Sequence, residues 1–229
     1  MPKYLWSHLA ECILSNKISK MKKINLGLIE CEFGNIGSLK AFFNVLGNVK
    51  VKPVKTPSDL IGIDVCILPG VGHFGAVMNG IDKLKLRHGI INFANSGNLL
   101  IGICAGAQVL LEHSDESEEA KGLNLISGFA RSLKLNNLYK DRIPRIGWQH
   151  TKWSEENLKK LGLMQGESCY YFAHSYELCP VNRGSIASVC NDGVIAAIAH
   201  NNILGLQFHP EKSQDDGIHI INSIIKKYA

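Results

Sequence analysis

Three short apolar segments, separated by longer stretches of mixed polarity, constrain the fold of this chain more than any other feature. They lie at residues 24–30, 65–68 and 99–103, and each is followed within a few residues by glycine or proline. A helical pattern of apolar residues over 39–46 follows the first. Apolar segments of this length are typical of parallel strands buried on both faces, with helices as connections. The sequence therefore predicts an open α/β sheet, mixed but mainly parallel, with helices on both faces.

The pattern changes after about residue 125, where strand-like segments follow one another with short turns between them: 127–135, 168–176, 186–190, 194–200 and 203–208. The Asn-Asp-Gly turn at 191–193 is typical of a hairpin, so these strands are expected to continue or attach to the sheet. An amphipathic pattern over 217–228 predicts a closing helix. Because no repeat or low-complexity linker interrupts the chain, we expect residues 21–229 to form one domain. Residues 1–20 are interpreted as an extension outside it, with a short docked amphipathic helix as the alternative.

Composition limits the classes of function. The 229 residues are 45% hydrophobic and 20% charged, as in an ordinary globular protein. The net charge of +5 is scattered rather than gathered in a basic stripe, which argues against nucleic-acid binding. No apolar run approaches the roughly 20 residues that span a bilayer, so no membrane segment is expected. The seven cysteines include no Cys-x-x-Cys pair and no cluster with histidine, which predicts no metal, no cofactor and a reduced cytoplasmic protein.

The third apolar segment runs into the motif Gly-Ile-Cys-Ala-Gly-Ala-Gln at 102–108. A cysteine between a strand and a helix, flanked by small residues, is typical of a nucleophile elbow, whose sharp turn exposes the side chain above the sheet. The helix N-terminus beside Cys104 favours the thiolate, and free N–H groups there can hold an oxyanion. A single Gly-x-Cys-x-Gly motif also fits a buried structural cysteine, so the prediction depends on finding a base.

Residues 207–212, Gln-Phe-His-Pro-Glu-Lys, supply both a base and an orienting group. His209 follows a predicted strand at its carboxyl end, where open α/β sheets gather their functional residues. Glu211 lies two residues further on, close enough to reach the same imidazole. A third motif, Leu-Pro-Gly-Val-Gly-His-Phe at 68–74, has two glycines after a strand and can present backbone N–H groups to a ligand. A plain tight turn is the alternative for this third motif.

Together, GICAGAQ, PGVGHF and FHPEKS resemble, in order and spacing, the motifs of class I (triad-type) glutamine amidotransferases, which have a flavodoxin-like architecture. The similarity is strongest to the glutaminase subunits of imidazole glycerol phosphate synthases. It covers residues 22–228 and includes the segments 34–35, 121–123, 144–148 and 171–176. The resemblance implies that the chain hydrolyses glutamine and passes ammonia to a (β/α)₈ cyclase subunit, with which it forms a heterodimer in histidine biosynthesis.

The resemblance also implies a role for individual residues. Cys104 would be the nucleophile, His209 the general base and acid, and Glu211 its orienting group. Three further groups are implied: an oxyanion hole at Val71, Gly72 and Ala105, a glutamine site at Gln108, Ser175 and Tyr176, and a partner-facing surface at Trp148, Tyr171 and Lys212. Trp148 is expected in a loop, because the surrounding Pro-Arg-Ile-Gly-Trp segment contains both proline and glycine.

Departures from the family pattern affect the pocket and the partner. Ala105 and Ala107 stand where leucine and methionine are usual, which leaves a smaller pocket wall. Arg145, Ile146 and Gln149 stand where histidine, methionine and asparagine are common in the partner-facing segment. Three alternatives therefore stay open: an ammonia supply for a surface-sugar amidating enzyme, a stand-alone cysteine hydrolase of γ-glutamyl compounds, and a non-catalytic binding subunit. The complete set of Cys104, His209 and Glu211 argues against the last.

Overall fold

The computed structural model describes residues 23–31, 34–137, 139–162 and 166–228. The predicted extension at 1–20 lies outside the described residues, so its separation from the domain at 21–229 stays a prediction. Within the described ranges, no helix is both long enough and apolar enough to cross a membrane.

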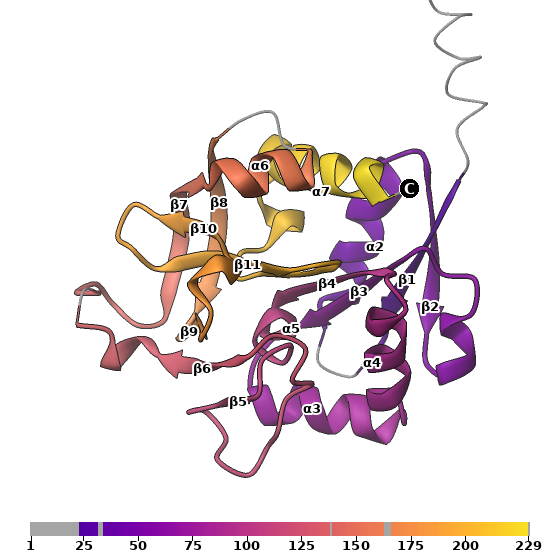
Figure 1. Ribbon diagram of the computed structural model, residues 1–229, viewed down its shortest axis with the longest axis horizontal. Coiled ribbons are helices and arrows are strands. Elements are labelled where there is room, and N and C mark those ends of the chain that lie inside the picture. The colour runs from indigo at the N-terminus through magenta and orange to yellow at the C-terminus, as the bar shows by residue number, and fades with distance from the viewer. Residues whose placement is uncertain (1–22, 32–33, 138, 163–165, 229) are drawn as a thin grey trace, which may run out of the picture.

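A mixed sheet of nine strands forms the centre of the molecule (Figure 1), in the order β2-β1-β3-β4-β12-β11-β10-β7-β8. The strands are β1 (Ile24–Ile29), β2 (Val49–Val54), β3 (Val65–Gly70), β4 (Leu99–Cys104), β7 (Arg145–Trp153), β8 (Glu167–His174), β10 (Ile186–Cys190), β11 (Ile195–His200) and β12 (Ile203–Leu206). Neighbours from β2 to β12 are parallel, and neighbours from β12 to β8 are antiparallel. The predicted mixed α/β sheet is confirmed, but it is not mainly parallel, since four neighbouring pairs of strands are parallel and four are antiparallel.

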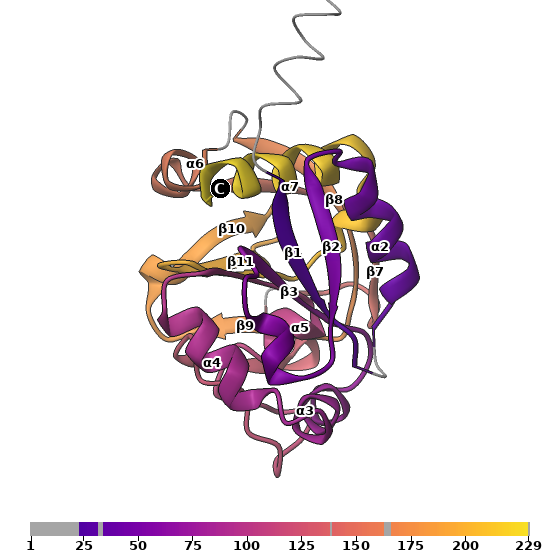
Figure 2. The ribbon, with the colours of Figure 1, turned by 90° about the vertical axis from the view of Figure 1, so that its right-hand side faces the viewer.

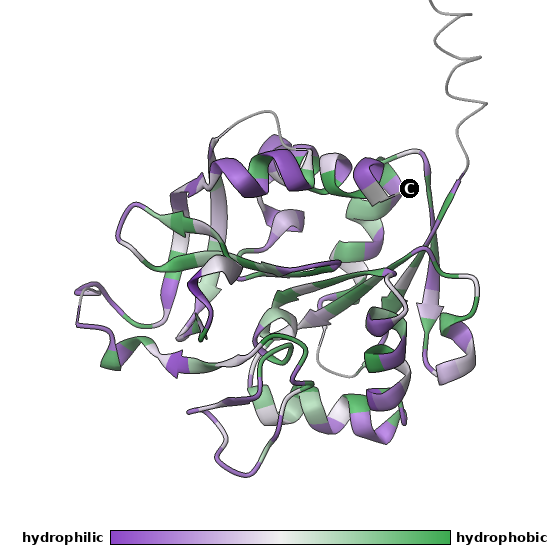
Figure 3. Cartoon of the chain, viewed as in Figure 1, coloured by the Kyte–Doolittle hydropathy of each residue, from purple (hydrophilic) through white to green (hydrophobic). Residues whose placement is uncertain are grey.

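Helices cover both faces of the sheet, as Figures 1 and 2 show. One face carries α2 (Ile36–Val45), α6 (Glu155–Leu161) and α7 (Gln214–Tyr228), and the other carries α3 (Phe74–Lys83) and α4 (Arg87–Asn95). Apolar side chains from each set of helices pack on the strands in two separate clusters. Hydrophobic colour is accordingly concentrated on the central strands in Figure 3. Burial on both faces explains why β1, β3 and β4 are apolar throughout.

A second, three-stranded sheet lies beside the first and consists of β5 (His113–Ser114), β6 (Gly128–Ser132) and β9 (Tyr176–Pro180). It corrects two predicted strands. The segment 127–135 ends as a strand at Ser132 and continues as a 3₁₀ turn, η2 (Leu133–Leu135). The segment 168–176 is divided at Ser175, because β8 belongs to the large sheet and β9 to the small one.

Trp148 lies in strand β7 rather than in the predicted loop. Eight residues of β7 pair with β8 in antiparallel register, and Trp148 is opposite Tyr171. Gly147, the residue that suggested a loop, has a φ of +136° inside the strand. The local turn signals of this segment are therefore overridden by pairing with a distant strand.

Candidate active site

The sharp strand-to-helix turn predicted at Cys104 is present, and the role of Cys104 as nucleophile stays a prediction. Cys104 is the last residue of β4 and directly precedes the single-turn helix α5 (Ala105–Gln108). Its φ of 55° and ψ of −115° are unusual for a residue other than glycine and store roughly 1–3 kcal/mol of strain. The glycines on either side permit this turn. A Cβ atom at Gly106 would lie 1.9 Å from the Leu68 carbonyl oxygen, and one at Gly102 would lie 2.5 Å from the Gly106 oxygen. The Gly-x-Cys-x-Gly spacing therefore follows from close packing of the elbow on β3.

The fold brings the three predicted catalytic side chains together. Nδ1 of His209 lies 2.9 Å from Oε1 of Glu211, and interaction with Cys104 contributes to the raised pKa of His209. The imidazole and the carboxylate are both almost completely buried. Burial alone would lower the pKa of His209, but the hydrogen bonds to Cys104 and Glu211 outweigh it and raise the pKa to about 10. This environment stabilises an imidazolium, the form that pairs with a cysteine thiolate.

The predicted oxyanion segment begins where β3 meets the elbow. Gly70, the last residue of β3, pairs with Cys104. Val71 and Gly72 follow directly, and Gly72 has a φ of +94° that favours glycine. Ala105 is buried beside Cys104 at the start of α5. The predicted segment therefore starts next to the residue that pairs with Cys104, and the role of these residues as oxyanion donors stays a prediction.

Gln108 and Gln207 form a buried amide pair beside Cys104. Nε2 of Gln108 donates to the Tyr176 carbonyl at 3.0 Å and to Oε1 of Gln207 at 3.2 Å. Nε2 of Gln207 in turn lies 4.0 Å from the Cys104 sulfur. The predicted glutamine-site residues Gln108, Ser175 and Tyr176 are thus gathered where β8 passes into β9. Gln207 was given no role from the sequence, because its burial and its approach to Cys104 are apparent only in the folded chain.

His174 is a second buried histidine near the triad that sequence reasoning did not identify. Its Nδ1 lies 2.8 Å from the Tyr176 carbonyl, which can only accept, so Nδ1 carries the proton. Burial lowers the pKa of His174 to about 4, and the charges of Arg145 and His209 act in the same direction. His174 is therefore neutral near pH 7, and His209 is the imidazole that carries charge at this site.

A carboxylate also approaches the site from the loop that follows α5. Oε2 of Glu116 accepts a hydrogen bond from the Phe74 backbone N–H at 2.6 Å, directly after the oxyanion segment. Burial raises the pKa of the Tyr176 hydroxyl, and the negative charge of Glu116 acts in the same direction. The sequence offered only an acidic run at 115–119, which alone is more typical of a solvated loop.

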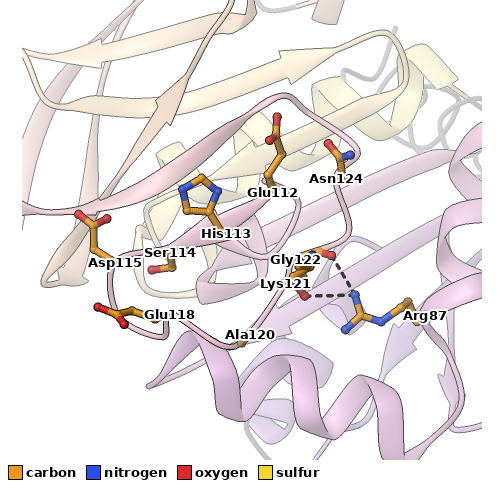
Figure 4. A pocket seen from close by; sticks show the side chains of 10 residues that line it. All are labelled: Arg87, Glu112, His113, Ser114, Asp115, Glu118, Ala120, Lys121, Gly122 and Asn124. Carbon is orange, nitrogen blue, oxygen red and sulfur yellow. Dashed lines mark hydrogen bonds between the residues drawn. The ribbon is translucent and has the colours of Figure 1, made fainter.

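A hollow of about 870 Å³ is lined by none of the three triad residues. Figure 4 shows its polar lining, which comes from residues between Glu112 and Asn124 and from Arg87. The Arg87 guanidinium donates to the carbonyls of Lys121 and Gly122 and so holds this loop in place. Among the described residues, no group of three or more His, Cys, Asp or Glu side chains could hold a metal ion.

The three predicted partner-facing residues form one surface on β8, β7 and the turn η4 (Pro210–Lys212). The rings of Trp148 and Tyr171 meet edge to face with centroids 6.0 Å apart. Nζ of Lys212 lies 5.5 Å from the Tyr171 ring centre. Trp148 is 44% exposed, and the Tyr171 carbonyl accepts a hydrogen bond from the His209 N–H at 2.9 Å. This aromatic surface is therefore joined directly to the backbone of the candidate base.

Comparison with known proteins agrees with this geometry. The family model "Glutamine amidotransferase class-I" matches residues 28–227. The imidazole glycerol phosphate synthase subunit HisH of Bacillus subtilis is 34% identical over 208 residues, which cover 89% of this chain and 97% of the relative. HisH of Pyrococcus furiosus is 33% identical, with 86% and 96% covered.

Solved structures show the same fold at lower identity. The crystal structure of a glutamine amidotransferase superposes with a TM-score of 0.70 at 18% identity, covering 89% of this chain and 98% of the other. A chain of PurLQS from Thermotoga maritima gives 0.67 at 18% identity, with 90% and 100% covered. The protein therefore belongs to the class I glutamine amidotransferase family, and within it to the group of HisH subunits.

Proposed function

We propose that this chain is the glutaminase subunit of an imidazole glycerol phosphate synthase. It hydrolyses glutamine to glutamate and ammonia and passes the ammonia to a (β/α)₈ cyclase subunit, in a cytoplasmic heterodimer that serves histidine biosynthesis. The arrangement of Cys104, His209 and Glu211 at the strained elbow carries the proposal for glutaminase chemistry. The relatives named as HisH subunits, which the chain matches over nearly their whole length, support the choice of partner.

The proposed reaction is an acyl transfer through a thioester. His209 holds the Cys104 proton as an imidazolium, and the sulfur attacks the side-chain amide carbon of glutamine. The C–N bond then breaks while His209 returns the proton to the departing nitrogen, which leaves as ammonia. His209 next removes a proton from water, whose oxygen attacks the thioester. The C–S bond breaks, glutamate leaves, and the proton taken from water stays on His209, which restores the starting pair of Cys104 and imidazolium.

Backbone N–H groups near Val71, Gly72 and Ala105 would hold the oxyanion in both tetrahedral intermediates. One such donor typically lowers the barrier by about 3 kcal/mol, which is more than a hundredfold in rate. A single N–H that points away from the sulfur would therefore keep the isolated subunit nearly idle. Alignment of that donor on binding of the cyclase would couple glutamine hydrolysis to synthesis.

Glu116 is the group that we assign to the α-ammonium of glutamine. The substrate presents a positive ammonium beyond the amide that reaches Cys104, and Glu116 supplies a carboxylate beside Tyr176 and the start of α3. A charged hydrogen bond of this kind contributes about 1.5–3 kcal/mol. Glu116→Gln should therefore raise KM for glutamine by about 10- to 100-fold and change kcat much less.

Glu118→Gln is the matched control, because Glu118 lies two residues away and lines the polar hollow instead. Its KM should stay within a factor of two of the wild-type value. Thermal melting of both variants checks the loss of the Phe74 contact, which would lower stability without a selective effect on KM. Equal KM values for Glu116→Gln and wild type would contradict the assignment.

The proposed function as a whole is tested with the cyclase subunit from the same organism. The mixture should form imidazole glycerol phosphate from the cyclase's ribonucleotide substrate with glutamine as the nitrogen source, whereas the cyclase alone should need added ammonium salt. The isolated chain should hydrolyse glutamine only slowly. Rapid hydrolysis by the isolated chain would favour a stand-alone hydrolase. A cyclase that works with ammonium but gains nothing from this chain would show that the ammonia serves another enzyme.

A further inference from the structure

A second, smaller hollow lies beside the partner-facing surface, at the start of α7. Its volume is about 420 Å³, and it is lined by Trp148, Cys169, Ser213, Gln214, Asp215 and Asp216. We call it the α7 pocket. Its rim is continuous with the surface formed by Trp148, Tyr171 and Lys212, since Trp148 belongs to both. A protein docked on that surface would therefore also cover the pocket.

The α7 pocket presents negative charge without a cation. Its lining contains two carboxylates and no lysine or arginine. Oδ2 of Asp216 accepts the Cys169 backbone N–H at 2.7 Å, so this carboxylate is already engaged. Asp215 is exposed and makes no hydrogen bond or ion pair with any residue in the described ranges. Acidic residues in a first helical turn stabilise the helix, but that role does not explain why Trp148 stands open beside them.

An exposed tryptophan next to a free carboxylate is suited to bind a cation. The face of an indole ring attracts ammonium and guanidinium groups, tryptophan more than tyrosine or phenylalanine. The nearest lysine of this surface, Lys212, lies over Tyr171. Trp148 and Asp215 are thus left for a positive charge that comes from another molecule.

The inner wall of the α7 pocket touches the catalytic centre. Ser213 is buried, and its Oγ donates to the His209 carbonyl at 2.6 Å while it accepts the Tyr171 N–H at 3.0 Å. A group seated in the pocket is therefore separated from the backbone of His209 by one side chain. A shift of Ser213 on docking of the partner would therefore act directly on the backbone position of His209.

We propose that the α7 pocket receives the side chain of one arginine or lysine of the synthase partner. The cation lies against the Trp148 ring and pairs with Asp215, and Ser213 links its position to His209. The inference rests on the proposed function, since it presumes that the aromatic surface docks a synthase. It adds the chemical class of the partner group and the residues that recognise it.

Asp215→Asn tests the proposal, because it removes the charge and keeps the shape. The full chain and the cyclase subunit are mixed, and Kd is measured by calorimetry at about 50 mM and about 500 mM salt. At low salt the variant should bind about tenfold more weakly than wild type, since truncating a charge of an interfacial pair costs at least that much. At high salt the difference should shrink to about twofold or less, because the charges are screened. The melting temperature of the isolated chain should fall only slightly, because the variant loses one favourable interaction with the helix dipole of α7.

Glu156→Gln is the matched control. Glu156 also lies exposed in the first turn of a helix, but α6 adjoins the far end of α7, where Gly162 approaches Lys227. This variant should bind the cyclase as wild type does at both salt concentrations. A double-mutant cycle then pairs Asp215→Asn with single alanine substitutions of the cyclase's surface lysines and arginines. One of them should remove the effect of Asp215→Asn.

The outcomes separate this inference from the proposed function. If Trp148→Ala weakens binding but Asp215→Asn does not, the surface docks the cyclase without a cation in the pocket, and the inference is overturned. The same holds if the effect of Asp215→Asn is independent of salt. If the wild-type chain binds no cyclase at all, the proposed function fails, and the inference that rests on it fails with it.

Discussion

Cys104→Ser is expected to abolish glutamine-dependent synthesis by the complex while leaving its ammonium-dependent synthesis intact. The hydroxyl of serine is far less acidic than a thiol, so His209 cannot generate an equivalent nucleophile in the same place. Removal of the nucleophile from a catalytic triad lowers kcat by roughly 10⁴-fold or more. The ammonium reaction bypasses glutamine and occurs on the partner. Both rates are measured on the same purified complex with glutamine and then with ammonium chloride as the nitrogen source.

Cys179→Ser is the matched control for that experiment. Cys179 is half-buried in β9, and burial, together with the charge of Glu177, raises the pKa of its thiol to about 11, so it is not an activated nucleophile. This variant should retain both activities. A glutamine-analogue electrophile should modify Cys104 and leave Cys179 unmodified, as read by mass spectrometry of peptides. Glutamine-dependent turnover above a tenth of wild type in Cys104→Ser would refute the assignment of the nucleophile.

The second large effect concerns stability. Gly106→Ala is expected to prevent the elbow from forming, because the added Cβ would lie 1.9 Å from the Leu68 carbonyl oxygen and 2.9 Å from its carbon. Both atoms belong to the backbone of a central strand and cannot rotate away. We expect a loss of about 4 kcal/mol or more in the free energy of unfolding, the range of the most damaging single substitutions. Urea unfolding followed by circular dichroism measures this loss.

For Gly37→Ala, the same kind of substitution, we expect the opposite effect on the free energy of unfolding. A Cβ at Gly37 would meet no atom within 4 Å, and the residue lies in the exposed first turn of α2. Alanine there should raise stability by about 0.5–1 kcal/mol, because glycine is entropically costly in a helix. If the two variants had similar stabilities, the close approach between the elbow and β3 would not be the reason for glycine at 106.

The fold was predictable where local pattern and long-range packing agree. Strands β1, β3 and β4 are uninterrupted apolar segments because both faces of the sheet are covered, and their predicted bounds are correct within two residues. Strand β2 was not identified, since its valines alternate with lysines and it contains Pro53. It lies at the edge of the sheet, where lysine and proline are tolerated. Strand β7 was taken for a loop because its partner, β8, is distant in sequence.

The candidate site was predictable to the extent that its residues belong to contiguous motifs. Cys104 and His209 each lie in a short motif whose residue types are enough to predict a nucleophile or a base. Glu116, His174 and Gln207 were not assigned from the sequence. Glu116 contacts Phe74, 42 residues away, and Gln207 contacts Cys104, 103 residues away. His174 contacts the Tyr176 carbonyl, which only the folded chain positions. Residue type alone gives no information about such contacts.

The predicted oxyanion segment consists of two residues, Val71 and Gly72, and the residues on both sides of it are held by close contacts. On one side Gly70 is packed against the elbow, where a Cβ would come within 2.5 Å of the Gly106 nitrogen. On the other side the His73 ring accepts the Gly75 N–H, and Glu116 holds the Phe74 N–H. Between these anchors, a side chain added at Gly72 would meet nothing within 4 Å. A change in the orientation of a peptide unit can thus be confined to Val71 and Gly72, while the residues on either side keep their contacts. The enzyme could be switched on by a few backbone torsions while its sheet, nucleophile and base stay in place.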